Sequence, residues 1–280
     1  MKDPSSLVKY DTPHPIVCFG APRTGTTLIW QCLRHIFVKV AKAHWPEMIL
    51  NQAATVSING VNQQVEAPRG FEAVPTYCVL PERDPVDSYI SLLRCNFTGA
   101  EKDFLKMING EVTPETQAAH DEAQASLYSL MNQLNYVAWL KRYYPGKLLV
   151  LDYKEFFYSY SYLYNEFEKF FNIEIPVETR VFLEKETNRD TNTKIQKTLK
   201  DFSEEDEDSL IHGNHIWKGY PGFAKDLLQP SHYDHLKNIF AGVSVGNGGA
   251  FRSKLQKNYK EACEGEGDTL YFTPGELVKE

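Results

Sequence analysis

The chain has 280 residues, of which 42% are hydrophobic and 13% aromatic. That length and apolar content can build one large α/β domain, or at most two small ones. The formal net charge of −7 argues against a general nucleic-acid binder, because binding to the phosphate backbone needs an excess of Lys and Arg. Residues 1–15 contain no apolar core typical of a secretion signal, and no apolar stretch reaches membrane-spanning length. We therefore expect a cytoplasmic protein with no nucleic-acid and no membrane partner, and the composition leaves its oligomeric state open.

The first part of the chain alternates between strand-like and helix-like apolar patterns. Residues 15–20 predict a strand, residues 26–36 the helix that follows it, and residues 38–44 a second strand. Residues 45–75 are polar and irregular, which predicts a loop with a short helix. The five cysteines form no CxxC pair, so we expect reduced thiols and no disulfide framework.

The alternation continues through the middle of the chain. Residues 77–83 predict a strand, and the next helix opens with Asp84 as N-cap and Pro85 in its first turn. Further elements follow in order: a helix over about 114–143, a strand at 147–153 and a helix at 162–173. Strands that alternate with helices indicate an α/β fold, with a P-loop-like central parallel β-sheet flanked by helices on both faces.

We treat the chain as a single domain over residues 1–280. Its core covers about residues 15–240, and residues 241–280 form a C-terminal tail that is flexible or acts as a lid. The acidic run at 203–208 is typical of a solvated surface. Four histidines in the last third form no convincing metal-ligand set: His212, His215, His232 and His235.

The turn after the first strand carries the clearest chemical signal. Gly20 and Gly25 enclose four residues, and a helix begins directly afterwards. Unpaired N–H groups at a helix start, together with the positive end of the helix dipole, form an anion site. Thr26 stands where a nucleotide P-loop has its lysine, and Arg23 lies three residues earlier. The loop therefore suits an anion with one 5′-linked group better than a triphosphate.

Two other segments also carry anion-binding devices. Arg83 leaves the end of a predicted strand, and Ser91 follows eight residues later along the next helix. Lys218 and Gly219 place a cation beside a backbone that can approach an anion closely. Ligands of parallel sheets bind at the carboxyl ends of the strands. The glycine loop and the segment that begins at Arg83 are expected to meet at this edge of the sheet.

Together, the three segments resemble the sulfotransferase family of cytosolic and bacterial small-molecule type, which uses 3′-phosphoadenosine 5′-phosphosulfate (PAPS). PRTGTT at 22–27 is similar to the family's P-x-SGTT loop, and Arg83 with Ser91 is similar to its Arg–Ser pair. WKGYPGFAK at 217–225 is similar to its R-K-G-x-x-G motif. The resemblance covers roughly residues 15–240, with all three motifs in the family's order.

The resemblance implies a role for each motif. The 5′-phosphosulfate would be bound by the glycine loop, at Arg23, Thr24, Gly25, Thr26 and Thr27. The 3′-phosphate would be bound by the other two segments, at Arg83, Ser91, Lys218 and Gly219. No metal is expected, because a sulfuryl group carries less charge than a phosphoryl group.

The resemblance also implies the catalytic residues. KAHWP is similar to the family's K-T-H-L-P, which makes His44 the general base toward a hydroxyl or amine of a small-molecule acceptor. Lys42 lies on the same side of the predicted strand and would neutralise developing charge, while Arg23 would stabilise charge on the leaving group. The acceptor pocket is expected from residues 45–75, residues 96–125 and the C-terminal tail.

Two alternatives remain open at this point. The first is a P-loop kinase or other NTPase that uses Asp152, at the end of the strand predicted at 147–153, to bind Mg²⁺. The second is a non-catalytic nucleotide-binding protein of the same fold. Preference for ATP with Mg²⁺ would indicate the first, and nucleotide binding without turnover would indicate the second.

Overall fold

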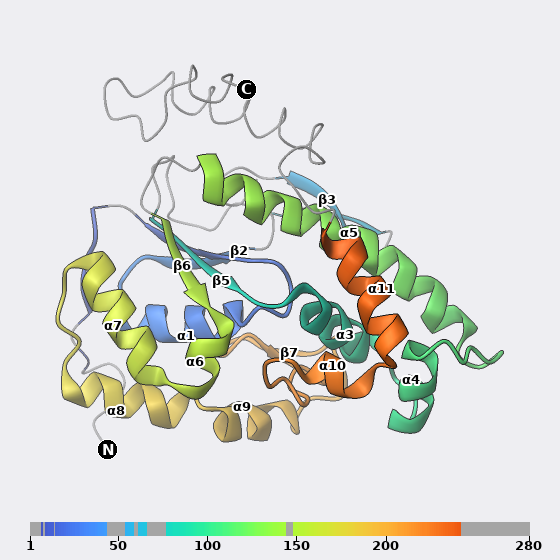
Figure 1. Cartoon of the computed structure of the whole chain (residues 1–280). Coiled ribbons are helices and arrows are strands. Elements are labelled where there is room, and N and C mark those ends of the chain that lie inside the picture. The colour runs from blue at the N-terminus through green and yellow to red at the C-terminus, as the bar shows by residue number, and fades with distance from the viewer. Residues whose placement is uncertain are drawn as a thin grey trace.

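A parallel four-stranded sheet forms the centre of the protein. The computed structural model describes residues 7, 9–13, 15–43, 54–58, 61–65, 77–143 and 148–241. The strands are β1 (Ile16–Phe19), β2 (Val40–Ala43), β5 (Tyr77–Glu82) and β6 (Leu148–Asp152). Their order in the sheet is β2-β1-β5-β6, and every neighbouring pair is parallel. This sheet and its flanking helices confirm the predicted α/β class (Figure 1).

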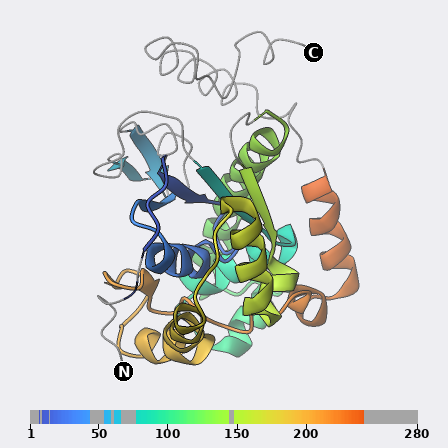
Figure 2. The same ribbon diagram turned by 90° about the vertical axis from the view of Figure 1, so that its left-hand side faces the viewer.

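Helices on both faces bury this sheet. One face packs against α1 (Thr26–Ile36), α6 (Tyr153–Tyr158), α7 (Tyr160–Phe171) and α8 (Val177–Glu186). The opposite side is covered by the long helix α5 (Gln117–Tyr143), as the two views in Figures 1 and 2 show. All four residues of β1 are buried, which explains why its sequence is a continuous apolar run and not an alternating one.

A second apolar cluster adjoins α3 (Pro85–Asn96), the helix that follows β5. It is formed with α4 (Glu101–Ile108), α5, α10 (Phe223–Leu227) and α11 (Pro230–Ala241). Asp84 caps α3 as predicted, because its Oδ1 accepts the backbone N–H groups of Val86 at 2.9 Å and Asp87 at 3.1 Å. The later part of the described chain also contains α9 (Arg189–Gln196) and the short pair β7 (Glu205–Asp206) and β8 (Ile211–His212).

The prediction for residues 45–75 is wrong where the structure describes them. β3 (Ala54–Ile58) and β4 (Val61–Val65) pair antiparallel, with Ile58 opposite Val61. In the sequence, Asn59 and Gly60 stand between these paired residues, and Asn-Gly is the strongest short hairpin signal. The second strand was also predicted to begin too early, because β2 starts at Val40 and the Val38 side chain is 58% exposed.

Four cysteines are free and buried, as predicted for reduced thiols: Cys18, Cys32, Cys78 and Cys95. Burial raises the pKa of the Cys32 and Cys78 thiols to about 12. These thiols are therefore protonated near neutral pH and act as small apolar core groups. Cys263 lies outside the described residues.

We predict a pH-dependent stability term from His35 in α1. Its ring packs edge-to-face on Phe182 with centroids 5.0 Å apart. Burial, followed by the charges of Arg34 and Lys9, lowers the pKa of His35 from 6.5 to about 4. Between pH 6.5 and about 4, His35 is protonated in the unfolded chain but not in the folded protein. The free energy of unfolding therefore falls as the pH falls through this range.

His35→Gln removes this proton uptake and should flatten the decline between pH 6.5 and about 4. Urea unfolding curves across that window measure the effect. His235→Gln, on the exposed side of α11, is the matched control and should leave the slope unchanged. Parallel curves for His35→Gln and the unsubstituted protein would contradict the assignment.

Candidate active site

The glycine loop joins β1 to α1 in the conformation that an anion site requires. Gly25 has φ +94° and is the N-cap of α1, with no side-chain cap and no acidic residue in the first turn. A Cβ on Gly25 would lie 2.8 Å from the Phe156 ring, so only glycine fits. The first N–H groups of α1 therefore receive no side chain from the N-cap, and the helix dipole adds positive potential there.

Hydroxyl groups line this loop. Thr24 Oγ1 donates to the Ala21 carbonyl at 2.8 Å and lies 3.2 Å from Thr26 Oγ1. Both side chains are buried against Gly20, where a Cβ would lie 2.9 Å from Thr24 Oγ1. The close approach of these three residues fixes the path of the loop into α1.

Arg23 brings α3 and the chain near residue 215 to the loop. It has φ +68°, an uncommon backbone conformation for a residue other than glycine. Its Nε donates to Ser91 Oγ at 3.1 Å, and its Nη2 donates to the His215 carbonyl. The structure therefore places Ser91 beside Arg23, although the sequence had paired Ser91 with Arg83.

The Arg83 guanidinium makes cation–π contacts with two aromatic rings. Its guanidinium carbon is 4.3 Å from the centroid of Tyr153 and 5.2 Å from that of Phe223. Its Nη1 donates to the Arg23 carbonyl at 2.8 Å and its Nη2 to the Gly219 carbonyl at 3.1 Å. Burial lowers the pKa of Arg83, but an arginine remains protonated in proteins. Its buried Nε has no hydrogen-bond partner in the described part of the chain, which fits a group that can bind an anion.

The third segment meets Arg83 through its backbone. The Gly219 carbonyl accepts from Arg83 and also from the Tyr153 hydroxyl at 2.8 Å. The neighbouring Lys218 turns toward α4, where its Nζ lies 3.5 Å from Glu101 Oε1. Among the described residues, no contact joins the Lys218 ammonium to Arg83. The structure thus brings Gly219, but not the Lys218 side chain, to the arginine.

Asp87 is a site residue that the sequence analysis missed. It is buried on α3, and its two carboxylate oxygens accept the N–H groups of Gly222 at 2.7 Å and Ala224 at 2.9 Å. This contact attaches the 219–224 segment to α3 and places Phe223 over Arg83. Burial raises the pKa of Asp87, while the two hydrogen bonds and Arg83 act in the opposite direction. The sequence contained a signal for this residue, because Asp87 lies four residues after Arg83 and four before Ser91, a spacing that puts side chains on one face of a helix.

Asp87→Ala is expected to destabilise the protein by about 1–3 kcal/mol, because two buried N–H groups lose their acceptor. Urea unfolding at neutral pH measures the loss. Asp234→Ala, at an exposed position of α11, is the control and should change stability by less than about 0.5 kcal/mol. Equal stability of the two variants would show that Asp87 does not hold the segment.

Lys42, on β2, points at the start of α1. Its Nζ donates to Thr27 Oγ1 at 2.9 Å. Burial lowers the pKa of Lys42, the charge of Glu205 raises it, and the charge of Arg23 lowers it. His44, the predicted general base, lies outside the described residues, as do residues 45–53 and 66–76 of the expected acceptor loop.

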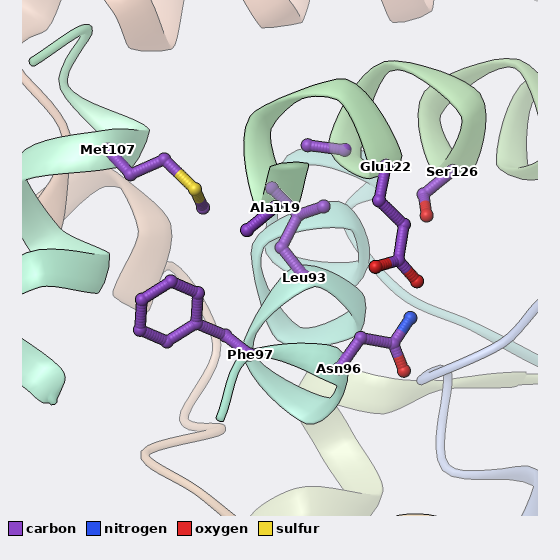
Figure 3. A pocket seen from close by; sticks show the side chains of 8 residues that line it. Leu93, Asn96, Phe97, Met107, Ala119, Glu122 and Ser126 are labelled. Atoms are coloured by element: carbon purple, nitrogen blue, oxygen red, sulfur yellow. The ribbon is translucent and has the colours of Figure 1, made fainter. Parts of the chain in front are cut away.

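A pocket open to solvent lies between α3, α4 and α5, within the segment expected to bind the acceptor. Its empty volume is about 250 Å³, including open solvent. Figure 3 shows the Glu122 carboxylate and the Asn96 amide on one side, and Phe97 and Met107 on the other. The lining of this pocket therefore combines apolar side chains with one carboxylate and one amide.

Asp152, the residue proposed to bind Mg²⁺ in the kinase or NTPase alternative, has a structural role. Asp152 caps α6, with its Oδ1 accepting the Lys154 N–H at 2.8 Å. Among the described residues, no group of three His, Cys, Asp or Glu side chains is arranged to hold a metal ion.

In the same part of the chain, every helix is too short or too polar to cross a bilayer.

Comparison with known proteins returns matches among solved structures only. No protein-family model matches the chain, and no curated protein matches its sequence. Among solved structures, it is similar to the crystal structure of mouse sulfotransferase SULT7A1 complexed with PAP, at 13% sequence identity and a TM-score of 0.42. The alignment covers 86% of this chain and 87% of that chain. Similarity at this level carries no argument about activity, so the proposals below depend on the residues and contacts described above.

Proposed function

We propose that the protein transfers a sulfuryl group from PAPS to a hydroxyl or amine of a small molecule. The observation that carries the proposal is the meeting of three sequence-distant motifs at the carboxyl end of the sheet. Arg23 contacts Ser91, and Arg83 contacts both the glycine loop and the segment at Gly219. The two arginines would together bind a nucleotide that carries an anionic group at both its 5′ and 3′ positions.

The cations and N–H donors around the glycine loop suit a sulfuryl donor. PAPS supplies the group to be transferred, and charge develops on its sulfuryl oxygens and on the departing phosphate. Fixed cations and N–H donors that point at those atoms stabilise the developing charge, and this stabilisation is the main catalytic effect in such transfers. The start of α1, Arg23 and Thr26 would hold the 5′-phosphosulfate, while Lys42 adds charge beside Thr27.

The 3′-phosphate distinguishes this donor from ATP. Arg83, Ser91, Lys218 and Gly219 are the residues that we assign to it, as the family resemblance implies. In the described structure, the buried Nε of Arg83 is a donor without a hydrogen-bond partner. We assign the acceptor's proton to a histidine, for which the sequence proposes His44, and we assign no metal to the reaction.

Isothermal titration with adenosine 3′,5′-bisphosphate and with ATP–Mg²⁺ tests the donor assignment. We expect the bisphosphate to bind more tightly and without Mg²⁺. Tighter binding of ATP that requires Mg²⁺ would favour a kinase or NTPase that uses Asp152, and would end the sulfotransferase proposal.

A labelled-sulfate transfer screen tests the reaction itself. The screen presents phenols, alcohols, amines and sugars to the protein with labelled PAPS, and transfer to at least one class is expected. Normal binding of the bisphosphate with no transfer to any class would indicate a non-catalytic nucleotide-binding protein.

A further inference from the structure

In the described part of the chain, three arginines donate to the backbone of one short segment, residues 215–219. Their acceptors are alternate carbonyls along this segment: Arg23 donates to His215, Arg189 to Trp217 and Arg83 to Gly219. Within the residues that the structure describes, none of these arginines forms an ion pair with a carboxylate. Cations that gather without an acidic partner leave positive charge for a bound anion. The proposed function uses Arg23 and Arg83, but not Arg189.

Helix α9 fixes the position of Arg189 beside this segment. Arg189 is the first residue of α9, and Gln196 is its last. Gln196 Nε2 donates to the Ile216 carbonyl at 3.1 Å, and the Ile216 N–H donates to Gln196 Oε1. Figure 1 shows α9 at the bottom of the molecule, between α8 and α10. The two ends of α9 thus contact consecutive residues, Ile216 and Trp217, so the helix lies along the segment.

A row of aromatic rings connects Arg189 to Arg83. The Arg189 guanidinium carbon is 6.0 Å from the centroid of Phe157, whose ring centroid lies 5.6 Å from that of Tyr153. Tyr153 in turn contacts the Arg83 guanidinium carbon at 4.3 Å. Burial raises the pKa of Tyr153, whereas the positive charges of Arg83, Arg23 and Arg189 act in the opposite direction. All three arginines are therefore near one tyrosine hydroxyl.

Arg189 is also within reach of a ligand bound at Arg83. The residues whose carbonyls accept from these two arginines, Trp217 and Gly219, are two positions apart. Their Cα atoms are thus at most about 7 Å from each other. Arg189 is exposed, so its long side chain can rotate toward the ligand without a rearrangement of the core.

A 3′-phosphate needs more positive charge than Arg83 supplies. A phosphate monoester carries about −1.5 to −2 charges near neutral pH, whereas a guanidinium carries one positive charge. Lys218, another cation assigned to this group, lies 3.5 Å from the Glu101 carboxylate, which offsets its charge. Arg189 has no carboxylate partner among the described residues, so its full charge is available to the phosphate.

We propose that Arg189 binds the 3′-phosphate of the nucleotide together with Arg83, and that it strengthens the preference for nucleotides that carry this group. The inference rests on the nucleotide site of the proposed function, and Arg189 lies outside all three motifs found in the sequence. A guanidinium has five N–H donors in a planar fork. One donor can therefore stay on the Trp217 carbonyl while others contact phosphate oxygens.

Titration calorimetry of Arg189→Gln with adenosine 3′,5′-bisphosphate and with adenosine 5′-phosphate tests this assignment. Glutamine keeps an N–H donor for the Trp217 carbonyl but removes the charge. We expect the Kd of the bisphosphate to rise by about tenfold or more, the usual loss for a charge-assisted contact. The Kd of the 5′-phosphate, which lacks the 3′ group, should change by less than about threefold.

Two further variants separate the charge of Arg189 from support of the segment. Lys194→Gln removes a positive charge from an exposed position of the same helix, and both affinities should stay within about threefold. Gln196→Ala removes the hydrogen bonds to Ile216 without a change of charge. It should leave the preference for the bisphosphate over the 5′-phosphate intact.

The outcomes distinguish this inference from the proposed function. If the unsubstituted protein prefers the bisphosphate and Arg189→Gln keeps that preference within about threefold, the inference is overturned and the proposed function stands. Equal weakening of both nucleotides in Arg189→Gln also overturns it, because Arg189 then only supports the segment. If the unsubstituted protein binds the 5′-phosphate as tightly as the bisphosphate, the 3′-phosphate site and the sulfotransferase proposal both fall.

Discussion

Replacing Arg23 with alanine is expected to lower the rate of sulfuryl transfer by about 10²- to 10³-fold, the usual cost of removing one fixed donor from a site of developing charge. Arg23 is the cation nearest in sequence to the start of α1, and its backbone is held with φ +68°. Its Nε contact with Ser91 and its Nη2 contact with the His215 carbonyl keep the guanidinium at the loop. Steady-state kinetics with labelled PAPS measure the effect.

Arg23→Lys is the matched control for this prediction. It keeps the positive charge but loses the planar fork that contacts Ser91 and His215 together. Because the family that the loop resembles usually carries lysine here, we expect the lysine variant to retain most of the turnover. Equal losses in the alanine and lysine variants would show that Arg23 acts through the shape of the loop and not through its charge.

Arg83→Ala should weaken binding of adenosine 3′,5′-bisphosphate by about 1.5–3 kcal/mol, or roughly 10- to 150-fold in Kd. The predicted loss is that of a charge-assisted contact to the 3′-phosphate. Titration calorimetry with the bisphosphate and with adenosine 5′-phosphate, which lacks that group, separates a selective effect from a general one. The 5′-phosphate should bind the variant and the unsubstituted protein with similar affinity.

The structure gives Arg83 a second role that the experiment must control. Its guanidinium contacts the rings of Tyr153 and Phe223 and donates to two backbone carbonyls, so alanine also removes packing. Urea unfolding of Arg83→Ala measures that part independently. Equal weakening of both nucleotides would mean that the side chain only supports the fold.

Much of the fold was predictable because local and global signals agree. The buried run of β1, the glycines after it and the helix from Thr26 appear where their patterns predict them. Asp84 and Pro85 marked the start of α3 for the same reason. The antiparallel pairing of β3 with β4 was missed because polar alternation is a weak strand signal, although the Asn-Gly sequence at 59–60 is a typical hairpin signal.

The site was less predictable than the fold, because spacing along one helix does not say what comes from elsewhere in the chain. The eight-residue spacing put Arg83 and Ser91 near each other, yet the hydrogen bond to Ser91 comes from Arg23, 68 positions away. Likewise, the ion pair of Lys218 with Glu101 depends on how α4 packs, which no motif encodes.

The hydrogen bond from the Arg83 side chain to the Arg23 carbonyl couples the positions of the two arginines. A change at either arginine shifts the backbone or the donor on which the other depends. A double-mutant cycle over Arg23 and Arg83 should therefore show non-additive losses in nucleotide affinity. We therefore expect that re-engineering the protein toward a different donor needs paired substitutions at Arg23 and Arg83.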